Sequence, residues 1–145
     1  MDNQDERYLR AAIRLAGEAR QTGDQPYGAL LVAADGTVLA EDRNTVVTER
    51  GITWHPELKL ARWAARELSA TATRTTTMYT SCQPCAMCVN AIARANLARV
   101  VYAPDGDQLH SLKPPGAMNP DATQVVYDGP ALFDEARVPI DGYYG

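Results

Sequence analysis

The sequence predicts an α/β fold: a three-layer α/β/α sandwich around a mixed sheet of five strands. After an initial helix and a hairpin, segments with helical spacing of apolar residues alternate with short β-branched segments. Such alternation is typical of sheets whose two faces are covered by helices. The chain has 145 residues, which is enough for one domain, 1–145, that buries its own core.

The first part of the chain predicts a helix followed by a β-hairpin. Apolar residues recur at helical spacing over 6–22, and Gly23 suits the end of that helix. Two short apolar segments, 29–32 and 37–40, flank Asp35-Gly36, a strong signal for the tight turn of a hairpin. The polar segment that follows, as far as His55, is expected to be a loop.

Two further helices, each beginning at a proline, alternate with the remaining strands. Pro56 and Pro84 suit the first turn of a helix, because a proline lacks the N–H that goes unpaired there. The predicted helices span 56–68, 84–92 and, as a weak short one, 130–137. The predicted strands span 75–80, 99–102 and 123–127. A segment with four prolines, 104–121, is expected to be a long loop.

Composition and charge argue against several classes of partner. The hydrophobic content of 46% and charged content of 22% are ordinary for a globular protein. The formal net charge of −4 disfavours a nucleic-acid partner, because neutralising phosphates dominates that affinity. No apolar run approaches the roughly 20 residues of a membrane span, and the acidic start resembles no secretory signal. We therefore expect a cytoplasmic protein with no membrane partner.

The cysteines are clustered in a way that favours metal binding. There are three, Cys82, Cys85 and Cys88, whereas a disulfide framework needs an even number, spread along the chain. An iron–sulfur cluster would need a fourth cysteine, and the sequence has none. Cys82 ends a predicted strand and is expected to be a small core residue.

His55, Cys85 and Cys88 have the residue types and spacing of a zinc site with three protein ligands. Cysteines three positions apart at the start of a helix share one face, so both thiols can reach one ion, and His55 supplies a nitrogen. Three protein ligands leave a fourth position for water, which is typical of catalytic zinc. Glu57, two residues beyond His55, is left to move protons as a general acid and base.

The order H-x-E followed by P-C-x-x-C is the signature of zinc deaminases that act on nucleobases. From about Leu9 to Tyr127 the chain resembles the cytidine/deoxycytidylate deaminase superfamily, in the branch of guanine deaminases and bacterial tRNA adenosine deaminases. The segment Met78-Tyr79-Thr80-Ser81-Cys82-Gln83-Pro84-Cys85 is similar to the guanine deaminase form. Pro26-Tyr27-Gly28-Ala29 resembles the family's entry into its first strand.

This resemblance implies a cytidine deaminase-like fold, bound Zn²⁺, hydrolytic release of ammonia and a homodimer. Asn44 resembles the family's asparagine that hydrogen-bonds the substrate. Two further substrate contacts are expected, at Tyr27 and Trp54, although Tyr27 could equally pack in the core and Trp54 against the neighbouring helix. In the guanine deaminase branch the C-terminal tail closes over the pocket, and here that tail would be 128–145.

Three positions depart from the family pattern. Pro56 stands where alanine is usual, which removes a backbone N–H that faces the pocket in the family. Gln83 stands where glutamate is frequent, and 112–116 lacks the paired aspartates of a typical bacterial guanine deaminase. The expected substrate is a small amino-substituted nucleobase or nucleoside, with a purine such as guanine favoured. The alternatives are an adenosine deaminase acting on tRNA or other nucleic acid, and a non-catalytic zinc-stabilised module.

Overall fold

A computed structural model describes residues 1–115 and 125–145 of the chain. The chain divides into two compact units, Met1–Pro115 and Gly116–Gly145, and each is described by itself. The first unit holds every residue that the sequence singles out for the metal and the substrate. The described part of the second unit is short and contains one helix, α6 (Phe133–Arg137).

The first unit is built around a mixed sheet of four strands in the order β2-β1-β3-β4. The strands are β1 (Gly28–Val32), β2 (Val38–Arg43), β3 (Thr77–Thr80) and β4 (Arg99–Tyr102). Strand β1 pairs antiparallel with both β2 and β3, and β3 pairs parallel with β4. The turn between β1 and β2 contains Gly36 with φ +88°, as the predicted hairpin requires.

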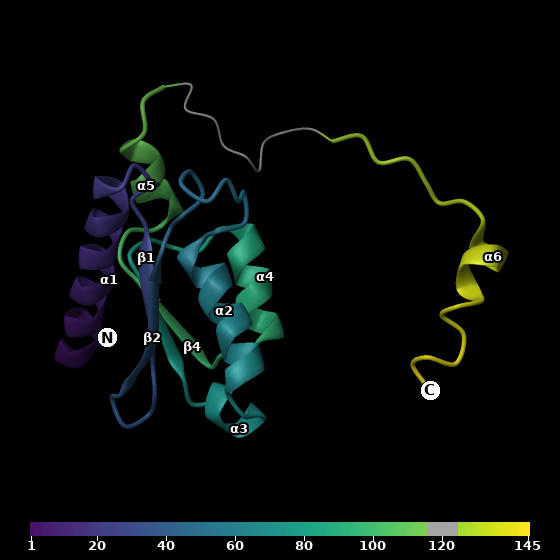
Figure 1. Cartoon of the computed structure of the whole chain (residues 1–145), viewed down its shortest axis with the longest axis horizontal. Helices are drawn as coiled ribbons and strands as arrows, with labels where there is room; N and C mark the ends of the chain where they lie inside the picture. The colour runs from purple at the N-terminus through teal and green to yellow at the C-terminus, as the bar shows by residue number, and fades with distance from the viewer. Residues whose placement is uncertain (116–124) are drawn as a thin grey trace. The chain divides into compact units, whose positions relative to one another are not determined.

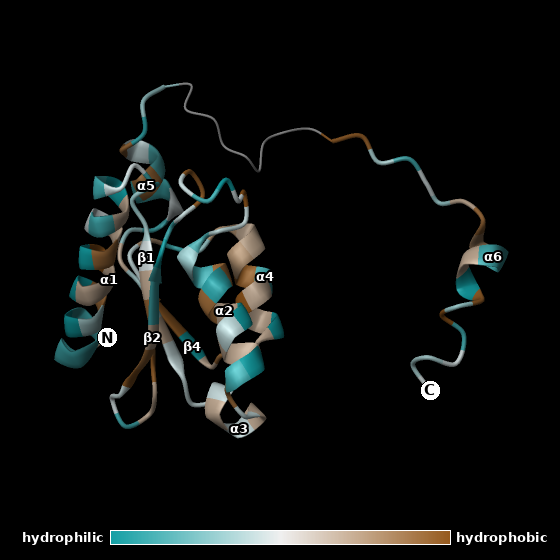
Figure 2. Cartoon of the chain, in the orientation of Figure 1, coloured by the Kyte–Doolittle hydropathy of each residue, from teal (hydrophilic) through white to brown (hydrophobic). Residues whose placement is uncertain are grey.

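Helices cover both faces of this sheet, which confirms the predicted α/β/α layers (Figure 1). Helix α1 (Asn3–Gln21) packs on one face, and α2 (Pro56–Glu67) and α4 (Ala86–Arg94) lie side by side on the other. Two short helices complete the unit, α3 (Ala70–Thr73) and α5 (Gly106–Ser111). In Figure 2, α1 and α2 carry hydrophilic residues on their outer surfaces, whereas α4 is mostly apolar.

The core lies on both sides of β1, the central antiparallel strand, whose five residues are all buried. Its side chains alternate: Leu30 and Val32 join the α1 side, and Ala29 and Leu31 join the α2 and α4 side. Burying one such leucine contributes about 1.5–3 kcal/mol. Because helices cover both faces, the sequence of β1 is a continuous apolar run.

The predicted fifth strand, 123–127, was wrong. The described residues Val125, Val126 and Tyr127 have no strand conformation, and their exposed fractions are 60%, 84% and 87%. The remaining two positions lie outside the described residues. A pair of β-branched residues favours a strand only where a neighbouring strand supplies hydrogen bonds and packing. No such pairing involves 125–127 in the part of the chain that the structure describes.

Other boundaries differ from prediction by a turn or less. Helix α4 begins at Ala86 rather than Pro84, because Cys85 is still extended (φ −71°, ψ 170°). The expected loop 104–121 contains α5, whose N-cap residue Asp105 forms a capping box with Gln108. Positions 116–121 lie outside the described residues. Within the described ranges, no helix combines the length and the apolar character that crossing a membrane requires.

Candidate metal centre and active site

His55 is placed by the start of α2. It is the N-cap residue, with extended backbone (φ −75°, ψ 142°), and Pro56 occupies the first helical position. A residue before proline is driven to extended backbone, so the sequence His55-Pro56 itself sets this geometry. The imidazole makes no capping hydrogen bond to its own helix. Its Nδ1 instead lies 3.5 Å from the sulfurs of both Cys85 and Cys88.

The two cysteines are placed by the start of α4. Cys85 is the N-cap residue and Cys88 lies one turn further on, fully buried. Both ligand segments therefore sit at helix N-termini, as predicted, where the helix dipole favours anionic thiolates. The hydrogen bond from the Cys88 thiol lowers the pKa of Cys85 to about 4, while that bond and burial raise the pKa of Cys88. The pair thus supplies one thiolate readily and releases a second proton when metal binds.

These three side chains fit zinc. The potential ligand atoms of His55, Cys85 and Cys88 lie within 4.8 Å of one another. Zinc–nitrogen and zinc–sulfur bonds at a tetrahedral ion put ligand atoms roughly 3.5–3.8 Å apart, close to the 3.5 Å from Nδ1 to each sulfur. No fourth His, Cys, Asp or Glu of the described residues belongs to this group. The donor set is that of an open catalytic site.

Glu57 lies beside the ligands but outside the ligand group. It is in the first turn of α2 and its exposed fraction is 5%. Its Oε1 accepts a hydrogen bond of 3.0 Å from Thr80 Oγ1. Burial raises the pKa of Glu57, and the hydrogen bonds from Thr80 and Cys88 only partly oppose this. A carboxyl group with a raised pKa is suited both to accept and to return a proton.

Asn44 is fully buried at the end of β2, and its side-chain amide is held in one orientation. Its Oδ1 accepts from the backbone N–H of Val46 at 3.0 Å, and its Nδ2 donates to Gln25 Oε1 at 3.1 Å. One N–H and one lone pair of the amide remain for a ligand. Gln25 was missed by sequence reasoning, since nothing in its local pattern marks a residue that will meet position 44 in space.

Two further residues that no motif reveals hold the loop between β2 and α2. Asp24 is buried and accepts from the backbone N–H groups of Val47 and Thr48 at 3.0 and 2.8 Å. Lys59 Nζ donates to the carbonyl oxygen of Arg43 at 2.9 Å and pairs with Asp42 at 3.0 Å. The segment that carries Asn44 is thus fixed from both sides, by the turn after α1 and by α2.

Tyr27 is half-buried immediately before β1. Burial raises the pKa of its hydroxyl, and electrostatic interactions with Cys82 and Glu57 raise that pKa further. The ring therefore lies within electrostatic reach of the carboxyl group beside the metal ligands. Its backbone carbonyl also accepts from the N–H of Asn44 at 3.0 Å, which joins the entry to β1 with the end of β2.

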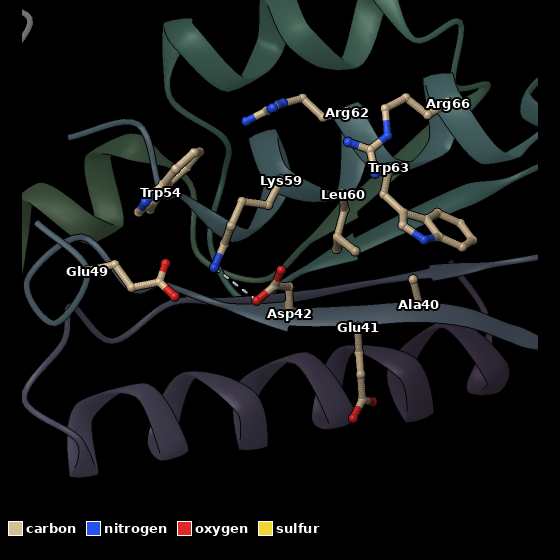
Figure 3. A pocket seen from close by; sticks show the side chains of 10 residues that line it. All are labelled: Ala40, Glu41, Asp42, Glu49, Trp54, Lys59, Leu60, Arg62, Trp63 and Arg66. Atoms are coloured by element: carbon tan, nitrogen blue, oxygen red, sulfur yellow. Dashed lines mark ion pairs between the residues drawn. The ribbon is translucent and has the colours of Figure 1, made fainter. Parts of the chain in front are cut away.

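Trp54 lines a cavity of about 460 Å³ between β2 and α2 (Figure 3). Arg62 of α2 lies over its ring, 5.6 Å from the centroid, and a Cβ at Gly51 would overlap the ring. Figure 3 shows Lys59 pointing to Asp42 across this cavity. None of the metal ligands belongs to the cavity wall. Trp54 thus contacts Arg62 of the neighbouring helix, and it lines a cavity to which none of the metal ligands contributes.

Comparison with known proteins gives the same chemistry. Residues 2–104 match the cytidine and deoxycytidylate deaminase zinc-binding region. Guanine deaminase of Bacillus subtilis (strain 168) is 33% identical over 137 residues, which cover 94% of this chain and 79% of that protein. The tRNA-specific adenosine deaminase of the same organism is 32% identical over 99 residues, 68% of this chain and 61% of that protein.

Solved structures agree with the fold. The crystal structure of Bacillus subtilis guanine deaminase superimposes with a TM-score of 0.78 at 28% identity, covering 99% of this chain and 94% of that chain. A structure of a tRNA:A34 deaminase superimposes with a TM-score of 0.61 at 29% identity, covering 69% and 76%. Together with the histidine and cysteine cluster, these similarities show that the chain belongs to the cytidine and deoxycytidylate deaminase family and is a zinc-dependent hydrolase of that family.

Proposed function

We propose that the protein deaminates a small amino-substituted purine, with guanine or a close analogue as the favoured substrate. The carrying observation is the buried Glu57, hydrogen-bonded through Oε1 and adjacent to three residues that fit an open zinc site. The similarity to a guanine deaminase over 94% of the chain supports a purine base. In the reaction, water replaces the ring amino group, and ammonia leaves as the ring gains an oxygen.

His55, Cys85 and Cys88 would hold the zinc, which when bound acidifies water and polarises it for attack. Glu57 accepts a proton from the attacking water and delivers it to a ring nitrogen, then takes the second proton from the newly added hydroxyl group and delivers it to the leaving amine. Its burial keeps bulk water away from this transfer. Asn44 orients the ring through the remaining N–H and lone pair of its amide, and Tyr27 forms a wall beside the carboxyl group. Trp54, which directly precedes His55 in the chain, is the third proposed substrate contact.

The second unit adds a further part to this proposal. We propose that 128–145 belongs to the same deaminase domain as a tail that closes over the pocket, as the family resemblance implies. Its apolar side chains support this role: Tyr143 and Tyr144 are 79% and 86% exposed, and apolar surface of that extent calls for burial. A chain truncated after Tyr127, which lacks the tail 128–145, should show a larger rise in KM than fall in kcat.

A cytoplasmic homodimer completes the proposal. The three cysteines are free rather than paired in disulfides, which suits a reducing compartment. Exposed apolar side chains near the ligand-bearing segments, Val47, Ile52 and Val89, favour contact with a second copy. Light scattering of the zinc-loaded protein would test the dimer directly.

Ammonia release from a panel of substrates tests the proposed reaction. Zinc-loaded protein should be assayed with guanine, adenine, cytosine, their nucleosides and triazine analogues, and with a tRNA anticodon stem. We expect release from a free purine base and none from the metal-free protein. Activity on the anticodon stem alone would favour the nucleic-acid deaminase, which the similarity to tRNA-specific enzymes makes the second candidate. Silence across the panel would favour the non-catalytic module.

A further inference from the structure

Thr80 is the buried partner of Glu57 that no motif assigns. It is the last residue of β3, and its exposed fraction is 0%. Its hydroxyl lies 3.0 Å from Glu57 Oε1 and 3.1 Å from the carbonyl oxygen of Cys82. The same side chain thus touches the proposed acid and base on α2 and the loop that carries the cysteines to α4.

The backbone of Thr80 is held from both sides by the sheet. Strand β3 lies between β1 and β4, and Thr80 pairs with Ala29 on one side and Tyr102 on the other. A β-branched side chain in such a strand has little freedom about χ1. The position of the Thr80 hydroxyl is therefore well determined, whereas Glu57 has a longer side chain that can rotate about several bonds.

Thr80 contacts one oxygen of the carboxyl group, Oε1. The Cys88 thiol is a second hydrogen-bond partner of Glu57. Because that thiol loses its proton when it binds zinc, Thr80 is then the remaining donor of the two, and Oε2 is left for exchange of a proton with water and substrate. The hydroxyl has one proton for two acceptors, Glu57 and Cys82, and both lie within hydrogen-bond range. Movement of the cysteine loop and rotation of Glu57 are therefore restrained by the same atom.

We infer that Thr80 is a positioning residue of the deamination reaction: it holds Glu57 by Oε1 so that Oε2 faces the reacting atoms. This inference rests on the proposed function, because it assigns Glu57 its role in proton transfer. Proton transfer is sensitive to misplacement of the acid or base by about 1 Å. Loss of the hydroxyl should therefore reduce kcat, while substrate binding through other residues is retained.

Thr80→Val and Thr80→Ser separate the hydroxyl from the shape of the side chain. Valine keeps the shape and removes the hydroxyl, and serine keeps the hydroxyl and removes a methyl group. We expect Thr80→Val to lower kcat by about 10- to 100-fold with KM changed by less than about threefold. Thr80→Ser should keep kcat within about threefold to fivefold of the unmodified protein, since the contact with Oε1 remains.

Thr76→Val is the matched control. Thr76 is a second threonine of almost no exposure, and its hydroxyl donates to the carbonyl oxygen of Ala72 at 2.8 Å, away from Glu57. Thr76→Val should lower the melting temperature about as much as Thr80→Val does, and it should leave kcat unchanged. Equal losses of kcat in Thr76→Val and Thr80→Val, or full kcat in Thr80→Val, would overturn the inference.

Crystal structures of the zinc-loaded protein and of Thr80→Val provide a readout that needs no turnover. We expect the Glu57 carboxyl group to leave its position, or to split between two, in Thr80→Val, and to keep it in Thr80→Ser. An unmoved carboxyl group in Thr80→Val would refute the positioning role whatever the activity. A displaced carboxyl group together with an inactive parent protein would refute the proposed function, and with it the role in deamination, while showing that Thr80 does hold the Glu57 carboxyl group in place.

Discussion

Pro56 separates a metal ligand, His55, from the proposed acid and base, Glu57. It favours the extended backbone of His55 and begins the helix that carries Glu57. It is fully buried and occupies the first position of α2, where a missing N–H disrupts no helical hydrogen bond. The same feature removes the backbone N–H that, as the family resemblance implies, would face the substrate.

Pro56→Ala restores that N–H and should strengthen binding of a substrate that presents an acceptor there. A hydrogen bond to an otherwise unpaired acceptor is worth roughly 1–3 kcal/mol, so we expect KM to fall by about fivefold or more while kcat changes little. Steady-state rates of ammonia release check this. An unchanged KM in a variant with an unchanged melting temperature would show that position 56 does not meet the substrate.

Cys85→Ser tests the ligand set against the neighbouring thiol. A serine hydroxyl is a much weaker zinc ligand than a thiolate, so zinc content should fall well below one ion per chain, as measured by elemental analysis after dialysis. Cys82→Ser is the control, because Cys82 is buried in the same segment but lies outside the ligand group. Retention of zinc by Cys85→Ser and its loss from Cys82→Ser would contradict the assignment.

At the scale of elements, one buried carboxylate joins the first helix to the strands β3 and β4. Asp5 in the first turn of α1 accepts from the Tyr79 hydroxyl at 2.6 Å and pairs with Arg99 through two bonds of 2.9 Å. The hydrogen bonds from Arg99 and then Tyr79 hold the pKa of Asp5 well below its ordinary range. Burial and Asp5 raise the pKa of Tyr79 to about 12.

Asp5→Asn should lower the free energy of unfolding by about 1–2 kcal/mol at neutral pH. This is the lower part of the range for hydrogen bonds to charged groups, because the Arg99 side chain is 47% exposed and solvent screens the pair. The pKa of Asp5 is lower in the folded protein than in the unfolded chain. Its contribution to the free energy of unfolding is therefore present above the unfolded-state pKa of about 3.9 and is lost as the pH falls toward the folded-state pKa. Denaturant unfolding at several pH values should show the difference shrinking below about pH 4, and a constant difference would contradict this account.

At the scale of the whole molecule, the metal site lies outside the two core clusters that stabilise the sheet. One cluster, on the α2 and α4 side, includes Leu31, Leu60 and Met78, and the other, on the α1 side, includes Leu30 and Tyr79. His55 and Cys85 belong to neither cluster. The zinc ligands therefore join the starts of two helices that the core already holds in place.

Removal of zinc should consequently lower the melting temperature without abolishing cooperative unfolding. Binding of a ligand to the folded state alone adds stability that grows with its concentration relative to Kd, so the melting temperature should recover when zinc is restored. Calorimetry of the chelated and reloaded protein measures both. A metal-free chain without cooperative unfolding would favour the alternative of a structural zinc module.

Local chemistry explains which features the sequence predicts well. The prolines beside His55 and Cys85 determine the backbone conformation within a single helical turn. The motif therefore predicts that both ligands lie at helix starts. Contacts between distant segments carry no such signal. Thr80 meets Glu57 and Gln25 meets Asn44 because the fold brings together segments that are distant in the sequence. The strand expected at 123–127 failed for the same reason, because pairing depends on a neighbour that its own residues do not specify.

The loss of turnover in Glu57→Gln tests the central claim most directly. Glutamine keeps the shape of the side chain and can still meet Thr80, but it cannot take up and return a proton. We predict that zinc-loaded Glu57→Gln retains its metal and its melting temperature and releases ammonia from a purine base at least about 100-fold more slowly than the unmodified protein. Equal rates for the two proteins would contradict the account.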